Sequence, residues 1–503
     1  MTIKNTLFYQ ILQHHVGIDM ILACKYQNSH NSYFSAILKF YILLVLIVNL
    51  LIRTIFAIYG YIATEEGTLL LNQQFAYQGQ LPFIHYDAWS SLLHDYLLGW
   101  HQLLFPGSIL FQRFIGICLS AIVFLACLKI AKSLHSSAPF YTAIFLTFGS
   151  WWYLYLSTIP YSEQFMTLFL ILAISHHKSP KLSLVFATLA TLVRSQALPA
   201  TLLFFIYFLK KSPRLWHVPL LVTAIVLLPW LIKDPKSIFW AFFWPLQANK
   251  ILMYQSDFSQ ITISQLINFF LEAIRDYGLI TTIAMAGIIT KTFTKQKKFM
   301  WLLFAIILTQ IVIGLIHQPP YASYISPVFP LIAIVAATAW AKHATKFSNI
   351  ILIGLLIFNI AVFPHAQFMK TSLSTITQTP YTHLNTIGAY VNSVTRSSDQ
   401  IISFYTPIAL AAQRELIPDF TRGPFSVSNL PDASSHHLIT TEKLRQLITS
   451  QAPAAIIITN KTTRVFKDID LLDQYYYSSK TFTEIRFLED PKTTELTVYL
   501  RRP

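Results

Sequence analysis

Long apolar stretches recur along most of the chain and constrain its fold more than any other feature. The first lies at about 36–59. A helix that rises about 1.5 Å per residue would cross the roughly 30 Å hydrocarbon core of a bilayer over such a length. Hydrophobic residues make up 54% of the 503 residues and charged residues only 12%, which excludes an ordinary soluble globular protein. The sequence therefore predicts a polytopic α-helical membrane protein.

Further predicted spans follow the first. They lie at about 110–130, 138–157, 160–175, 215–232, 275–290, 298–316, 322–341 and 347–364, and a shorter helical hairpin at 181–210 brings the total to about 11 spans. Dense clusters of Lys and Arg fall in alternate loops, so the positive-inside rule places residues 1–35 in the cytoplasm and 60–109 outside. These loops account for the formal net charge of +15, and we expect no nucleic-acid partner.

The chain turns polar after the last predicted span. We expect 36–364 to form the transmembrane domain and 365–503 to form an external α/β domain. Helices are predicted at 380–395 and 440–450, and strands at 401–405, 454–459, 482–488 and 495–500. This domain has no Gly-rich phosphate loop and no nucleophile elbow, so we assign it no chemistry of its own. We expect it to be a cap that helps to recognise the acceptor.

Acidic residues are few, yet four of them stand in the first external loop, 60–109: Glu65, Glu66, Asp87 and Asp95. A fifth, Glu163, follows Pro160 at an outer membrane edge. A carboxylate can take a proton from an acceptor hydroxyl during a transfer reaction. The concentration of acids beside a membrane exit therefore indicates an active-site loop.

Three arginines lie inside or beside the predicted spans. Arg53 is in the outer half of the first span, Arg113 opens the second, and Arg194 is at the apex of the 181–210 hairpin. A charge at mid-bilayer costs about 2.5–3.5 kcal/mol even on a lenient scale, so it should face protein or a water-filled cavity. The planar guanidinium suits phosphate oxygens. The alternative is that Arg53 or Arg113 snorkels to headgroups or pairs with a loop glutamate.

Several motifs occur in the order seen in a known superfamily. Glu65-Glu66-Gly67, an amphipathic stretch, GQLPFIHYD (79–87) and Arg113 together resemble the first external loop of GT-C glycosyltransferases. The likeness is closest to the protein O-mannosyltransferase and aminoarabinose-transferase branch. PYSE (160–163) resembles the second acidic site of that branch, and YASYISPVFPLIAI (321–334) resembles its late Tyr-Pro-Pro span. The resemblance covers about 36–364.

The resemblance implies an inverting enzyme that transfers a sugar from a polyprenyl-phosphate donor to a hydroxyl of a protein, lipid or cell-envelope glycan. Either Glu65 or Glu66 would act as the base on the acceptor, and Glu163 would be a supporting acid. Arg113 and Arg53 would hold the donor phosphate or the loop. We expect no cofactor and no metal. The expected location is the bacterial inner membrane, with the C-terminal domain in the periplasm.

The sequence departs from the family pattern at two points. It has Glu-Glu where members often have Asp-Glu, and it reads AWSSL (88–92) where the aminoarabinose branch commonly has a basic residue and prolines. The second departure removes a candidate phosphate ligand, for which His85, His94 or Arg194 could substitute. Tyr86 and Asp87 are further candidates for substrate binding.

Two other functions remain open at this stage. A transporter or flippase for a lipid-linked saccharide would also have many spans and buried charges, but the sequence shows no paired repeats. A structural or assembly protein with an external domain would leave the pair of adjacent glutamates unexplained.

Overall fold

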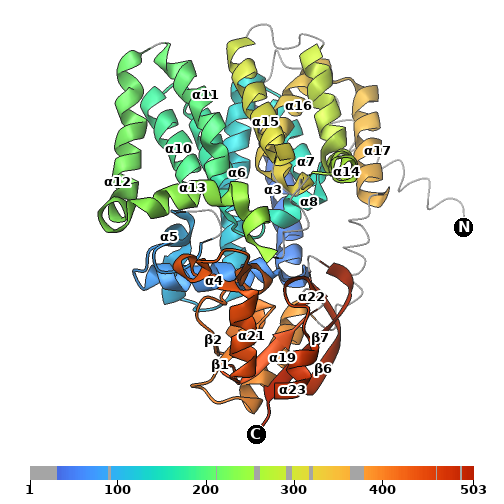
Figure 1. The fold of residues 1–503 in the computed structure, drawn as a ribbon. Coiled ribbons are helices and arrows are strands. Elements are labelled where there is room, and N and C mark those ends of the chain that lie inside the picture. The colour runs from blue at the N-terminus through green and yellow to red at the C-terminus, as the bar shows by residue number, and fades with distance from the viewer. Residues whose placement is uncertain are drawn as a thin grey trace, which may run out of the picture.

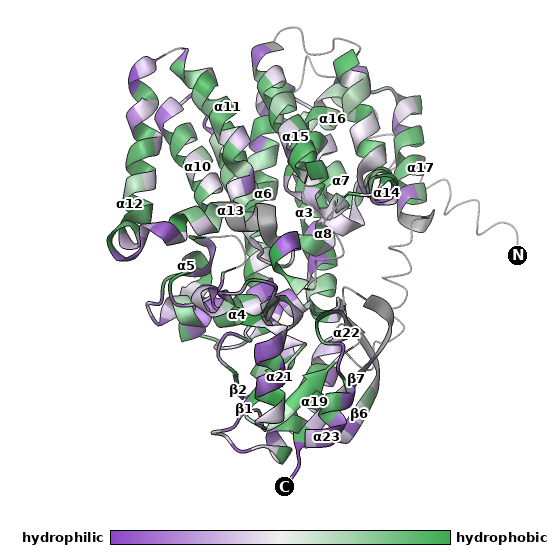
Figure 2. Cartoon of the chain, in the orientation of Figure 1, coloured by the Kyte–Doolittle hydropathy of each residue, from purple (hydrophilic) through white to green (hydrophobic). Residues whose placement is uncertain are grey.

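The computed structural model describes residues 31–88, 92–210, 212–253, 261–289, 297–316, 321–362, 379–459, 462–487 and 490–503. The segment 365–378 and most of AWSSL therefore lie outside the described residues. The chain forms a layer of roughly parallel helices, with a sheet-containing domain at one end of it (Figure 1). Hydrophobic residues dominate the helical layer, and hydrophilic residues are more frequent in the sheet domain (Figure 2).

The helical layer is built from the apolar stretches. Its helices are α3 (Asn31–Tyr59), α6 (Ile109–Leu134), α7 (Ala138–Phe148), α8 (Trp151–Leu156), α9 (Ser162–Ser175), α10 (Pro180–Val193), α11 (Leu198–Leu209), α12 (His217–Lys233), α14 (Ile263–Ile289), α15 (Lys297–Ile316), α16 (Phe329–His343) and α17 (Lys346–Val362). A short 3-10 helix, η7 (Ala322–Val328), leads into α16. The predicted hairpin is confirmed, because α10 and α11 meet at Arg194.

Five helical stretches among the described residues are long and apolar enough to cross a membrane: Ala36–Tyr59, Ile109–Leu134, Pro213–Lys233, Lys298–Ile316 and Ala322–His343. The total of about 11 spans stays a prediction. Burial separates these stretches: 89% of the most apolar window of Ala322–His343 is buried, against 22% of that of Ala36–Tyr59. The stretch formed by η7 and α16 therefore lies inside the helical layer, whereas α3 lies at its edge.

The structure corrects two predictions about this part. The predicted span 138–157 is two helices, because the chain breaks after α7 and the hydroxyl of Ser150 caps α8 by accepting a hydrogen bond from the Tyr153 amide at 3.0 Å. The segment 233–262, for which we predict no helix between the spans 215–232 and 275–290, contains the helix α13 (Pro235–Ile251), which lies across the ends of neighbouring helices (Figure 1). Asp234 caps it by accepting from the Lys236 amide at 3.1 Å.

The first loop, 60–109, holds the helices α4 (Thr64–Tyr77) and α5 (His94–Gly99) and the 3-10 helix η2 (Trp100–Leu103). Helix α4 lies between the helical layer and the C-terminal domain (Figure 1). Leu70 of α4 and Ile62, which precedes the helix, belong to a core that continues into that domain and includes Ile401 and Ile408. The loop is therefore enclosed on both sides.

The C-terminal domain is α/β, as predicted. Its main sheet has the strand order β2-β1-β5-β7-β6, in which β1 is parallel to β2 and β5, and β7 is antiparallel to β5 and β6. The elements are α19 (Pro380–Val394), β1 (Gln400–Ser403), α20 (Thr406–Ala411), β2 (Glu415–Leu416), α21 (Thr441–Thr449), β5 (Ala455–Ile458), β6 (Tyr476–Phe487) and β7 (Asp490–Arg501). The two predicted helices and four predicted strands all correspond to elements of this set.

Candidate active site

The two adjacent glutamates lie in the first turn of α4. Negative side chains are favourable there because the N-terminus of a helix carries a partial positive charge. The Oε1 atom of Glu66 reaches back and accepts a hydrogen bond from the Ala63 amide at 2.8 Å. Neighbours on a helix point about 100° apart, so Glu65 and Glu66 face different surroundings.

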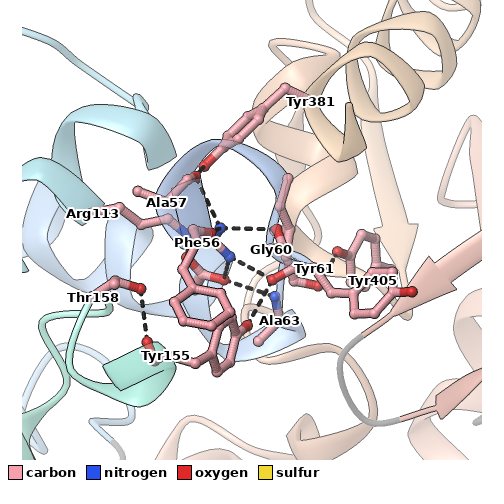
Figure 3. Close-up of polar contacts among 12 residues, drawn as sticks. Phe56, Ala57, Gly60, Tyr61, Ala63, Arg113, Tyr155, Thr158, Tyr381 and Tyr405 are labelled. Carbon is pink, nitrogen blue, oxygen red and sulfur yellow. Dashed lines mark hydrogen bonds and ion pairs between the residues drawn. The ribbon is translucent and has the colours of Figure 1, made fainter. Parts of the chain in front are cut away.

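Glu66 is locked in a buried ion pair with Arg113. The Nε and Nη2 atoms of Arg113 each donate to one carboxylate oxygen of Glu66 at 2.7 Å, and both side chains are 0% exposed. The same guanidinium donates to the carbonyl groups of Phe56, Ala57 and Gly60, at 3.3, 3.1 and 2.9 Å (Figure 3). Arg113 thus closes the end of α3 and fixes the start of α4. The resemblance implies that Arg113 holds either the donor phosphate or the loop, and these contacts fit the second role.

Arg53 is also engaged by the protein itself. Its Nε atom donates to Asn49 at 2.8 Å, and its Nη1 atom donates to Ser120 and to the Leu154 carbonyl at 3.2 Å each and also contacts Ser157. These contacts join α3, α6 and α8, and Arg53 is 1% exposed. The geometry therefore gives Arg53 a structural role in place of the predicted contact with donor phosphate.

Glu163 and Arg194 form a second ion pair. Glu163 lies in the first turn of α9, and its Oε1 atom is 2.9 Å from Arg194 Nη2. Arg194 also donates to Ser162 at 2.7 Å and to Gln196 at 2.8 Å. The Arg194 side chain is 4% exposed and that of Glu163 is 29% exposed. The carboxylate is therefore accessible while the guanidinium is held behind it.

Glu65 belongs to the same group. Tyr324 of η7 interacts electrostatically with Arg194 and Glu163 and, more weakly, with Glu65. Glu65 itself is half-buried, in contrast to Glu66. We call Glu65, Glu163, Arg194 and Tyr324 the Glu65 cluster. The sequence predicted three of its members, and Tyr324 lies in the YASY motif without an assigned role.

The remaining predicted substrate ligands have partners within the protein. Tyr86 donates to Asp95 at 3.1 Å, and burial raises the pKa of its phenol well above the usual value. Asp87 pairs with Arg422 of the C-terminal domain, and burial raises the pKa of this carboxyl group even beside the guanidinium. His85 is exposed, and its Nδ1 atom accepts from the Leu81 amide at 2.7 Å. These contacts shape the loop.

His94 connects the first loop to the turn that carries Glu163. Its Nδ1 atom lies 3.0 Å from Asp95 and its Nε2 atom 2.8 Å from the carbonyl of Pro160. His94 is 1% exposed, so its contacts hold two parts of the site together. They do not match the phosphate-ligand role considered for it.

Sequence reasoning missed the residues of the C-terminal domain that reach the loop. Tyr405 donates to the Ile62 carbonyl at 2.6 Å and Tyr381 to the Ala57 carbonyl at 2.9 Å (Figure 3). Arg422, already described, reaches the middle of the loop and pairs with the side chain of Asp87. No local motif marks such residues, because their role depends on a contact between distant parts of the chain.

A charged pair in α14 was also missed, although the sequence carried a signal. Arg275 donates to both carboxylate oxygens of Asp276, at 2.8 and 3.1 Å, and Asp276 is 5% exposed. Two charges at the start of the predicted span 275–290 should have been counted among the intramembrane candidates. Within the described residues, no group of three or more His, Cys, Asp or Glu is arranged to hold a metal ion.

Comparisons with known proteins bear on the fold. No protein-family model and no curated protein matches the sequence, but solved structures do. ArnT from Cupriavidus metallidurans, bound to undecaprenyl phosphate, matches with a TM-score of 0.59 and 10% identity over 92% of this chain and 98% of that chain. The chain has the GT-C fold.

The archaeal oligosaccharyltransferase AglB from Archaeoglobus fulgidus, in complex with an inhibitory peptide and a dolichol-phosphate, matches more distantly. Its TM-score is 0.52 and its identity 11%, over 88% of this chain and 73% of that chain. The resemblance predicted over 36–364 is therefore confirmed at the level of fold, and the match to ArnT extends into the C-terminal domain. At such identities the likeness establishes the fold alone.

Proposed function

We propose that the protein is an integral membrane glycosyltransferase that moves a sugar from a polyprenyl-phosphate donor to a hydroxyl of an acceptor. The observation that carries the proposal is the Glu65 cluster, which gathers two accessible carboxylates and one buried arginine at the first loop of a GT-C fold. ArnT and AglB have been solved with undecaprenyl phosphate and a dolichol-phosphate, respectively, which supports a lipid phosphate as the donor carrier.

Glu65 is the base in this proposal. Its carboxylate accepts the proton of the acceptor hydroxyl while the hydroxyl oxygen forms a bond to the anomeric carbon of the sugar. The bond from that carbon to the phosphate oxygen breaks in the same step, and the polyprenyl phosphate leaves with the electron pair. Glu66 is unsuited to this task because both its oxygens are bound to Arg113 in a fully buried pair.

Arg194 supplies positive charge where the leaving phosphate gains negative charge. The N–H groups of Arg194 are held in position by contacts with Ser162, Glu163 and Gln196. Glu163 orients this guanidinium through its contact with Nη2, which is the supporting role implied for that residue. Tyr324 adds a hydroxyl beside the three charged groups.

The acceptor, the sugar and the orientation belong to the same proposal. The distribution of Lys and Arg supports a cytoplasmic N-terminus and a C-terminal domain on the external face, as in a bacterial inner membrane. The acceptor would be a protein, lipid or cell-envelope glycan brought to the loop from the external side. The transporter alternative gains no support from the solved structures that match.

A transfer assay on protein in nanodiscs tests this function. A panel of polyprenyl-phosphate sugars is offered with acceptors, and the released polyprenyl phosphate is measured by mass spectrometry. Glu65→Gln should lower turnover about 10²–10⁴-fold, which is the usual contribution of a general base, without lowering the melting temperature. Glu442→Gln, at an exposed position of α21, is the matched control. Full activity in Glu65→Gln would exclude Glu65 as the base.

A further inference from the structure

Helix α5 is packed tightly against α4, the helix that carries Glu65. A Cβ atom at Gly99 of α5 would be 3.2 Å from the Gln73 carbonyl oxygen and 3.3 Å from the Tyr77 amide nitrogen. Only glycine lets two backbones approach each other so closely without a side chain in the way. The position of α5 is therefore tied to that of α4 and of the carboxylate at its start.

The same short helix shares a core with the elements that carry the ion pair of Glu163 with Arg194. Leu98 of α5 belongs to a small buried cluster with Phe165 of α9 and Val193 of α10. Phe165 stands two residues after Glu163, and Val193 directly precedes Arg194. Helix α5 is therefore joined by packing to both parts of the Glu65 cluster.

His94, the first residue of α5, adds a directed hydrogen bond to this packing. Its ring meets the Phe165 ring edge to face, with the two centroids 5.6 Å apart, and its Nε2 atom is 2.8 Å from the Pro160 carbonyl oxygen. A carbonyl oxygen can only accept a hydrogen bond, so Nε2 carries a proton and donates. Pro160 opens the turn in which Glu163 pairs with Arg194. The bond therefore joins the first loop to the backbone of that turn.

The orientation of the His94 ring is fixed from its other side. The Nδ1 atom is hydrogen-bonded to Asp95 Oδ1 at 3.0 Å, and Asp95 Oδ2 accepts a hydrogen bond from Tyr86 at 3.1 Å. All three side chains are buried. The partner of one ring nitrogen decides the orientation of a histidine and the role of its other nitrogen. Asp95 and Tyr86 therefore aim the Nε2 proton at Pro160.

We propose that His94 is a positioning residue that sets where Glu163 and Arg194 lie relative to Glu65. The inference rests on the proposed function, in which Glu65 takes the acceptor proton and Arg194 stabilises the leaving phosphate. Because the reacting atoms must be aligned during the displacement, an error of about 1 Å between these two groups can cost about 10²-fold in rate. His94 itself is 1% exposed, so it acts through the backbone of residues 160–163 and not through the substrate.

Two substitutions separate the two hydrogen bonds of His94. The amide nitrogen of glutamine reaches about as far as Nε2 and that of asparagine about as far as Nδ1, so His94→Gln should keep the bond to Pro160 and His94→Asn the bond to Asp95. We expect His94→Gln to keep kcat within about threefold of wild type and His94→Asn to lower kcat about 10–100-fold, both with unchanged KM for the donor.

Stability separates this role from a purely structural one. His94→Gln removes a partner of the buried Asp95 carboxylate, which is costly, so it should melt no higher than His94→Asn. If His94 served only to stabilise the fold, His94→Gln would then be no more active than His94→Asn. Equal kcat values for the two variants, or a higher value for His94→Asn, would overturn the proposal.

Hydrogen–deuterium exchange gives a readout that needs no turnover. Peptides that cover residues 160–166 should exchange faster in His94→Asn than in His94→Gln, because only the first variant frees the turn from the first loop. If this difference is found but the wild-type protein transfers no sugar, the positioning contact stands and the transferase function fails. If the wild-type protein transfers sugar while the two variants exchange and turn over alike, the positioning role fails alone.

Discussion

Replacing Glu66 by alanine should separate the roles of the two adjacent glutamates. Glu66→Ala removes the carboxylate that pairs with Arg113 at 2.7 Å through two hydrogen bonds. It also removes the acceptor of the Ala63 amide at the start of α4. The Arg113 guanidinium would remain fully buried with only backbone carbonyl groups as partners. Glu65→Ala leaves all of these contacts intact.

The expected loss of stability follows from these contacts. Removing one partner of a buried ion pair costs about 3–5 kcal/mol, and the carbonyl contacts that Arg113 keeps place Glu66→Ala near the lower end, about 3 kcal/mol. The lost contact at the helix start adds about 1 kcal/mol. A total of about 4 kcal/mol is large beside typical stabilities of about 5–15 kcal/mol. Glu65→Ala should cost less than Glu66→Ala, because Glu65 is half-buried and takes no part in the buried pair with Arg113.

Thermal unfolding in nanodiscs measures the difference. Glu66→Ala should lower the melting temperature by an amount on the order of 5–10 °C, whereas Glu65→Ala should lower it less and abolish transfer. A Glu66→Gln variant keeps the hydrogen-bonding shape without the charge and should fall between wild type and Glu66→Ala. The reasoning would be refuted if Glu66→Ala melted like wild type, or if Glu65→Ala were the less stable of the two.

Two further substitutions probe the docking of the C-terminal domain on the first loop. A Cβ atom at Gly67 would be 2.5 Å from the backbone nitrogen of Pro407, so Gly67→Ala should destabilise this contact by about 1–3 kcal/mol. Gly354→Ala is the control, because a Cβ atom there would have nothing within 4 Å. Equal melting temperatures for the two variants would contradict the packing at Gly67. His437, whose Nε2 atom lies 3.0 Å from the Ile84 carbonyl of the first loop, donates a hydrogen bond to the carboxylate of Asp419, and this bond raises the pKa of the imidazole above 6.5. Its stabilisation, at most about 1 kcal/mol for a partly exposed pair, is present below about pH 6.5 and lost as the pH rises through the higher folded pKa. The difference in melting temperature between wild type and His437→Gln should therefore shrink from pH 6 to pH 9, and a constant difference would argue against the pair.

The spans and the C-terminal elements could be predicted because their signals are local. The hairpin apex at Arg194 followed from two apolar stretches too short to be separate long spans, and the strands followed from short apolar runs between turns. Helix α13 was missed because its sequence has neither the length of a span nor a clear stripe. Its Asp234-Pro235 start is nevertheless a recognisable helix signal.

The choice between Glu65 and Glu66 could not be made from the sequence. Helical geometry alone indicated that only one of them faces the cavity. Which one depends on the position of Arg113, which comes from the start of another helix, 47 residues further along the chain than Glu66. The same holds for Arg53: its position in a span was visible, but its acceptors on α6 and α8 were not. Long-range partners decide whether a buried arginine serves a ligand or the protein.

The first loop is held near its start and near its middle by parts of the protein that are distant in sequence. Near its start, Arg113 binds Glu66, and Tyr405 of the C-terminal domain binds the Ile62 carbonyl. Near its middle, Asp87 pairs with Arg422 of the same domain. Glu65 lies between these fixed points, so its position depends on the C-terminal domain as well as on the spans. The first loop is therefore part of the surface on which this domain docks, a contact that the sequence did not predict.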